Sequence, residues 1–170
     1  MGLGMATNLQ KHVSQLPGAF PLQYHNRTMS RGDPLRELGA SPAESIPALT
    51  ASSDVIFLSL SNDEALSAAI DAVLGAEGSL EGKLVVDTST VHPDSSVAAR
   101  DRLAARGVVF LATPVFGASP VAAEGKLLWI LAGPEAGVQV ITPYLVGVMA
   151  RQVIRLGEDV KQASLLKTAG

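Results

Sequence analysis

The chain alternates between apolar runs of strand length and stretches in which apolar residues recur every three or four positions. The apolar runs predict strands at residues 22–25, 54–60, 83–87, 108–111, 127–132 and 152–156. The stretches with helical spacing predict helices at residues 3–16, 63–74, 93–106, 134–148 and from 159 onward. Strands that are apolar throughout need helices on both faces of their sheet, so the pattern indicates a mostly parallel sheet of βαβ units. The predicted fold class is α/β, doubly wound. Between residues 33 and 53, prolines at 34, 42 and 47 limit any helix to a few turns.

Composition narrows the possible functions. The 170 residues are 47% hydrophobic and 17% charged, as in ordinary globular domains, and a net charge of −3 provides no basic surface for nucleic acid. The chain has no cysteine, and we expect no disulfide, thiolate nucleophile or metal site. No apolar run approaches the roughly 20 residues needed to cross a membrane, and no secretory signal opens the chain. We therefore expect a cytoplasmic protein, with the mitochondrial matrix as the alternative compartment.

Three polar turns directly follow apolar runs: residues 26–28, 59–63 and 87–92. In open α/β sheets, ligands bind beyond the carboxyl ends of the strands, which is where these turns are expected to lie. A polar turn also caps the helix that follows it, so polarity alone does not distinguish a ligand site from a helix cap. In the same way, His92 is interpreted as a turn residue and Trp129 as a packing residue of the sheet.

Four segments together resemble the β-hydroxyacid dehydrogenase family, which includes 3-hydroxyisobutyrate dehydrogenase and 6-phosphogluconate dehydrogenase. Residues 1–9 resemble the second half of its fingerprint G-L-G-x-M-G-x-x-M-A-x-N-L, and residues 87–91 resemble its strand-end Ser-Thr segment. Residues 113–118, with Ala123, Gly125, Lys126 and Leu127, resemble the substrate segment A-P-V-S/F-G-x and its trailing A-x-x-G-x-L. Residues 165–170 resemble the start of the interdomain helix. The resemblance implies a Rossmann-type NADP-binding domain at residues 1–156 and the start of the interdomain helix at 157–170.

The resemblance also implies cofactor-binding residues. Gly2 matches the third glycine of the fingerprint, where a side chain would hold the helix away from the sheet. An NAD enzyme would place an acidic residue in the first polar turn, whereas Arg27 can pair with a 2′-phosphate, so the implied cofactor is NADP. The cofactor-binding residues implied in this way are Gly2, Asn26, Arg27, Thr28, Leu60, Ser61 and Thr90.

For the reaction, the resemblance implies hydride transfer between NADP(H) and a small β-hydroxyacid or its semialdehyde. Lys167 would be the general acid that protonates the carbonyl oxygen during reduction. Without the resemblance, Lys167 would be interpreted as an exposed helix lysine. The intact parent protein would be a homo-oligomer. The implied substrate-binding residues are Ser89, Phe116, Gly117 and Ala118.

The pattern departs from the family at both ends. No strand precedes Met1, so the first two glycines of the fingerprint are missing. We therefore expect a gap between the strand at Leu22 and the strand at Asp54, with two unpaired edges. The helical domain that follows Gly170 in the family is absent too, and we expect the polypeptide as written to be inactive or nearly so. Two alternatives stay open: a non-catalytic dinucleotide-binding module for regulation or interaction, and an inactive fragment.

Overall fold

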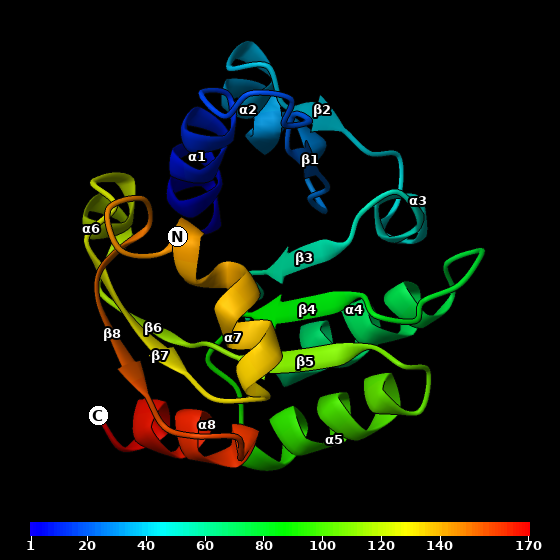
Figure 1. Ribbon diagram of the computed structural model, residues 1–170, viewed down its shortest axis with the longest axis vertical. Coiled ribbons are helices and arrows are strands. Elements are labelled where there is room, and N and C mark those ends of the chain that lie inside the picture. Colours follow the sequence, from blue (N-terminus) through cyan, green and yellow to red (C-terminus); the bar gives the residue numbers. More distant parts are fainter.

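Three parallel strands form the centre of the molecule (Figure 1). The computed structural model describes all residues from Met1 to Gly170. The strands pair without register shifts, and their last residues, Leu58, Asp87 and Ala112, are partners across the ladder. The three loops that follow therefore leave the sheet at the same level. The strands are β3 (Val55–Leu58), β4 (Leu84–Asp87) and β5 (Val109–Ala112).

A second set of strands continues from β5. An isolated antiparallel bridge between Ala112 and Ala132 connects β5 with the end of the next long strand, β7. Within this set β6 pairs antiparallel with β7, and β7 pairs parallel with β8. The bounds are β6 (Val115–Phe116), β7 (Leu127–Leu131) and β8 (Ala150–Arg155).

The N-terminal strands stand apart from the central ladder. β1 (Gln23–Tyr24) pairs in parallel with β2 (Ser41–Pro42) in a separate two-stranded sheet. β3 is hydrogen-bonded to β4 on one side and to no strand on the other. The expected gap between the first and second predicted strands is therefore present.

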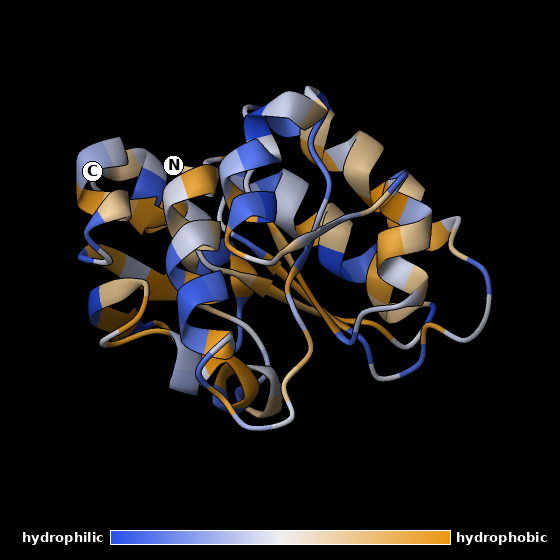
Figure 2. Cartoon of the chain, turned by 90° about the horizontal axis from the view of Figure 1, so that it is seen from above, coloured by the Kyte–Doolittle hydropathy of each residue, from blue (hydrophilic) through white to orange (hydrophobic).

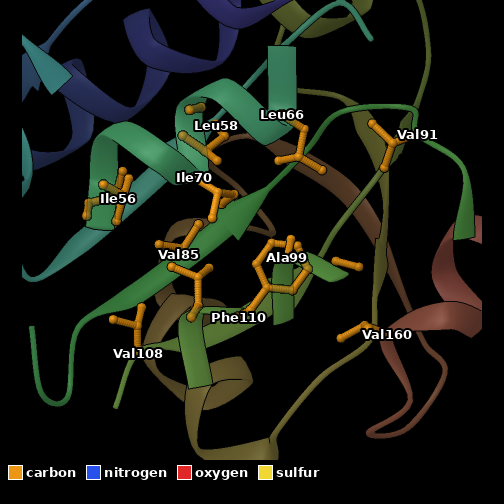
Figure 3. Close-up of a cluster of buried hydrophobic side chains, with 14 of the residues drawn as sticks. Ile56, Leu58, Leu66, Ile70, Val85, Val91, Ala99, Val108, Phe110 and Val160 are labelled. Atoms are coloured by element: carbon orange, nitrogen blue, oxygen red, sulfur yellow. The ribbon is translucent and has the colours of Figure 1, made fainter. Parts of the chain in front are cut away.

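Helices cover both faces of the sheet, as predicted. Side chains alternate along β4, so that Val85 belongs to one buried cluster while Leu84 and Val86 belong to the other. Figure 3 shows the first cluster, in which the strands pack against α4 (Asp63–Leu74), α5 (Pro93–Ala104) and α8 (Val160–Ala169). The second cluster joins the strands to α1 (Gly2–Val13) and α7 (Glu135–Ile141). Figure 2 shows the apolar strands enclosed between these helices.

The fully buried Trp129 belongs to the second cluster and meets Phe57 edge to face, with ring centroids 6.4 Å apart, which confirms its predicted packing role. None of the helices is both long enough and apolar enough to cross a lipid bilayer.

The short elements differ from the predictions. The helix predicted to reach residue 148 ends at Ile141, and a 3-10 turn containing Pro143 follows it. Proline lacks the backbone N–H that a continuing α-helix would use. β6 and α6 were not predicted, because two and five residues are too short to show a period. The remaining elements are η1 (Met29–Gly32), α2 (Asp33–Glu37), α3 (Ile46–Ala51), α6 (Ser119–Ala123) and η2 (Thr142–Tyr144).

Gly4 brings α1 against α6. A Cβ at Gly4 would lie 2.9 Å from the backbone nitrogen of Ala123, so no side chain fits there without moving a helix. One turn later, the Asn8 amide donates hydrogen bonds to the carbonyl oxygens of Ala122, at 3.0 Å, and Ala123, at 3.1 Å. Asn8 thereby adds a hydrogen bond to each of the last two carbonyl groups of α6 and joins the two helices.

We expect Gly4→Ala to lower the free energy of unfolding by about 1–3 kcal/mol, since the added methyl meets backbone rather than a movable side chain. Gly75→Ala is the matched control, because its Cβ would make only ordinary contacts at 3.5 Å and its φ of −84° suits alanine. Urea unfolding of both variants measures the difference. Equal stabilities for the two variants would contradict the close contact between α1 and α6.

Candidate functional site

Two of the predicted site loops are tied together at the carboxyl edge of the sheet. The buried hydroxyl of Ser89 accepts a hydrogen bond from the backbone N–H of Leu60, at 2.9 Å. The backbone N–H of Ser89 in turn donates to the Asp87 carboxylate, at 3.0 Å. The loop after β3 and the loop after β4 are thus held by one short chain of hydrogen bonds. Contact of Ser89 with a substrate stays a prediction.

The first turn of α1 approaches the same edge. A Cβ at Gly2 would lie 3.2 Å from both Cβ and Oγ of Ser59, the residue that follows β3. No side chain caps the start of α1, and its first turn contains no acidic residue. The free backbone N–H groups and the positive end of the helix dipole therefore favour an anion at this position.

The turn after β1 carries unpaired positive charge. The side chains of Asn26, Arg27 and Thr28 are exposed, and the Asn26 amide donates to the Thr28 carbonyl oxygen at 2.8 Å. Arg27 forms no salt bridge, and neither does Arg31, which lies on the 3-10 helix that follows. Arg31 was not predicted as a site residue.

Lys167 and Phe116 lie next to each other. The Lys167 ammonium nitrogen is 4.2 Å from the centroid of the Phe116 ring. Phe116 is half-buried at the end of β6, and exposed Gly117 and Ala118 follow it. Gly117 has a φ of +138°, and a Cβ there would lie 2.7 Å from Leu127, so glycine is required for this turn.

The structure brings only some of the predicted residues into contact. Leu60 contacts Ser89, and Phe116 contacts Lys167, across long separations in the sequence. Ser61 and Thr90 are exposed, and their side chains make no hydrogen bonds. The Asn26–Thr28 turn forms hydrogen bonds only with its own neighbours. His92 is a turn residue, as predicted: its ring nitrogen caps α5.

Asp87 is a buried acid that the sequence analysis did not single out. Only 1% of the residue is exposed, and burial raises the pKa of its carboxyl to about 6, while hydrogen bonds from Ser89 act in the opposite direction. The available signal was an acidic residue at the end of a fully apolar strand, which is unusual for a core position.

Comparison with known proteins identifies the family. Residues 1–157 match the family model described as the NAD binding domain of 6-phosphogluconate dehydrogenase. The chain belongs to the β-hydroxyacid dehydrogenase family.

Individual relatives agree with this membership. The chain is 35% identical to the NADH-dependent oxidoreductase ucdB of Aspergillus ustus, over all of this chain and 56% of that protein. It is 34% identical to the chloroplastic glyoxylate/succinic semialdehyde reductase 2 of Arabidopsis thaliana, over 93% of this chain and 42% of that protein. The solved reductive aminase of Aspergillus terreus, in complex with NADPH4, cyclohexanone and allyl amine, matches with a TM-score of 0.82 and 26% identity. That match covers 99% of this chain and 55% of the aminase. The chain thus spans about half the length of the relatives it matches.

We expect the stability of this family member to depend on the ionisation of Asp87. Its pKa, about 6, lies above the ordinary value of 3.8, so the folded state binds this proton more tightly than the unfolded state. The proton on Asp87 therefore stabilises the folded state, and this stabilisation is lost as the pH rises. The free energy of unfolding should fall by roughly 3 kcal/mol at most between about pH 4 and about pH 6.

Asp87→Asn should remove this loss, because the amide cannot ionise and its oxygen can still accept from Ser89. Urea unfolding between pH 4 and pH 7 measures the effect. Asp54→Asn is the control, at an exposed carboxyl without a salt bridge. Its free energy of unfolding should depend on pH as in the wild type. A wild-type pH dependence of the unfolding free energy in Asp87→Asn would contradict the prediction.

Proposed function

We propose that this chain is the NADP-binding half of an oxidoreductase that transfers hydride between NADP(H) and a small β-hydroxyacid or its semialdehyde. The observation that carries the proposal is the approach of the first turn of α1 to the end of β3, with Gly2 at the point of contact. The family match over residues 1–157 supports a nicotinamide dinucleotide as the ligand of this edge.

The residues present fit such a ligand. At Gly2 a Cβ would lie 3.2 Å from Ser59, so glycine leaves room close to the backbone. The free N–H groups of the first turn of α1 can donate to the pyrophosphate oxygens, and no acidic side chain of this turn opposes them. The loop at Leu60 and Ser61 and the exposed Thr90 would run along the remainder of the ligand, towards the nicotinamide.

Preference for the 2′-phosphate would come from the turn after β1. Arg27 and Arg31 are both exposed and form no salt bridge, and residues 25–32 contain no acidic side chain that would repel a phosphate. A guanidinium can form two parallel hydrogen bonds with phosphate oxygens. The descriptions of the relatives mention both cofactors: ucdB is described as NADH-dependent, and the aminase was solved with NADPH4.

Lys167 is the proposed proton donor. When bound, the cofactor supplies the hydride, and this chain supplies placement and charge. The ammonium of Lys167 would donate a proton to the carbonyl oxygen of the substrate, and the backbone N–H groups of Gly117 and Ala118 would hold the substrate carboxylate. Small residues at these two positions allow that approach. The semialdehyde substrate in the name of the Arabidopsis relative fits this chemistry.

The same proposal includes the domain organisation, oligomeric state, location and partners of the full-length protein. Residues 1–156 would form the cofactor domain, and 157–170 would begin a helix leading to a second domain. The full-length protein would be a homo-oligomer in the cytoplasm or the mitochondrial matrix. Its partners would be small molecules rather than nucleic acid or membranes.

We expect Arg27→Ala to weaken NADPH binding by about 10- to 100-fold, which corresponds to the loss of one or two charge-assisted hydrogen bonds. NADH binding should change little, because NADH lacks the 2′-phosphate. Isothermal titration of both cofactors measures this, with Arg106→Ala as the control at an exposed arginine without a salt bridge. Tighter binding of NADH than of NADPH, with no effect of Arg27→Ala on NADPH, would refute the NADP assignment.

We expect Lys167→Ala to lower kcat for semialdehyde reduction by about 10²- to 10⁴-fold in the full-length gene product, as for other general acids. The Kd for NADPH should stay near the wild-type value, because the lysine acts on the substrate. Lys161→Ala, on the same helix, is the control. Full activity in Lys167→Ala would remove the catalytic assignment while leaving cofactor binding in place. A wild-type protein that binds NADPH and reduces no semialdehyde would favour a non-catalytic dinucleotide-binding module.

A further inference from the structure

We propose that the side chain of Phe116 is a positioning residue for Lys167: its ring face holds the ammonium group at the end of β6, where the substrate would bind. This inference rests on the proposed function for its catalytic meaning. It assigns a role to the ring, whereas the family resemblance implies only a role for the backbone of this segment.

The ring is carried by a fixed part of the chain. Phe116 pairs with Leu128 in the antiparallel β6–β7 ladder, and the preceding Val115 is 5% exposed in the second buried cluster. Directly after Phe116, Gly117 turns the chain, and its hydrogen atom lies where a Cβ would meet Leu127. The backbone on both sides of the ring is therefore constrained, and the half-buried ring packs against the first buried cluster.

The lysine is also carried by a fixed element. Ala163, Ser164 and Lys167 lie three, four and seven residues after Val160, so the four residues share one face of α8. All of these except Lys167 are buried against α5 and the sheet, and the hydroxyl of Ser164 lies 2.6 Å from that of buried Ser96 on α5. The buried face of α8 ends at half-buried Lys167, which directs its side chain to Phe116.

No acidic group competes for this ammonium. Lys126 and Lys161 each contact a carboxylate, and Lys83 donates to a backbone carbonyl oxygen. The recorded partner of the Lys167 ammonium is the ring, at 4.2 Å from its centroid, which is within the range of a cation–π interaction. Such an interaction favours the contacting rotamer by about two- to fivefold at a partly exposed site. Unlike a carboxylate, the ring accepts no proton and leaves the amine free to donate to a substrate.

Nuclear magnetic resonance of the 170-residue chain tests the contact directly. With ¹³C-labelled lysine, the ε-CH₂ signals of the five lysines are recorded, and Lys167→Arg assigns the one that disappears. A methylene above an aromatic face is shifted upfield, so the Lys167 signal should lie upfield of the other lysine signals. This shift should be lost in Phe116→Leu and kept in Phe116→Tyr. The Lys161 signal, from the same helix, should not move in either variant.

The position of the Lys167 signal in the wild type and in Phe116→Leu decides whether the proposal stands. A wild-type Lys167 signal at the position of exposed Lys11, or an upfield signal that persists in Phe116→Leu, overturns the proposal. If Phe116→Leu fails to fold, a nuclear Overhauser contact between the ring protons of Phe116 and the ε protons of Lys167 in the wild type decides the question in its place.

A kinetic measurement on the full-length protein tests the meaning of the contact. Phe116→Leu should lower kcat about two- to fivefold and leave the Kd for NADPH unchanged, and Phe116→Tyr should restore kcat. An unaltered kcat in Phe116→Leu contradicts a positioning role. Failure of the proposed function is distinguishable, because absence of NADPH binding refutes that function and leaves the upfield shift intact. NADPH binding without the shift refutes only the role of Phe116.

Discussion

The register of β3, β4 and β5 is the constraint on which the candidate site depends. Since side chains alternate along a strand, a slip of one residue would exchange the two buried clusters and bury the wrong faces. The ladder is extended by one residue beyond its last pairs. Thr88 donates from its backbone and its hydroxyl to the Leu58 carbonyl oxygen, at 2.9 and 2.7 Å, and Thr113 donates in the same way to the Asp87 carbonyl oxygen, at 2.7 and 3.1 Å. These bonds fix the direction in which each loop leaves the sheet, so the burial of the core also places the loops of the site.

The long elements could be predicted because their signals are local and repeated. The helix expected at residues 63–74 has those bounds, with Asn62 as its capping residue. The central strands were found from apolar runs alone, with differences of one or two residues at their ends. β6 and α6 could not be found, because their conformations are set by pairing with β7 and by contact with α1 rather than by their own sequence. The helix after Pro134 was predicted too long, since apolar spacing continues past Ile141 while the backbone does not.

The loops of the candidate site could be located from the sequence, but the contacts between their residues could not. The rule that ligands bind beyond the carboxyl ends of strands locates the loops, and the family resemblance names residues within them. It does not say that Ser89 would turn its hydroxyl to Leu60, or that Phe116 would present its ring to Lys167. These pairs are 29 and 51 residues apart along the chain, and only the packing of helices on the sheet determines which atoms meet. The burial of Asp87 is similar, because an acid at the end of a strand becomes buried only when neighbouring loops cover it.

The two ends of the proposed dinucleotide would contact parts of the chain that are held in place by different interactions. The loops of the central ladder are joined by backbone hydrogen bonds, whereas β1, which leads to Arg27, has no hydrogen bond with β3. α1 connects the two parts: its apolar side chains enter the second cluster, and its buried Gln10 accepts from the backbone of Leu22 at 2.9 Å and donates to Leu38 at 3.1 Å. A single side chain therefore holds the segments on both sides of the arginine turn against the helix whose start would bind the pyrophosphate. The turn after β1 can consequently change in sequence without disturbing the ladder that positions Ser89. The arrangement of Lys167 depends on α8 and on β6, which carries Phe116.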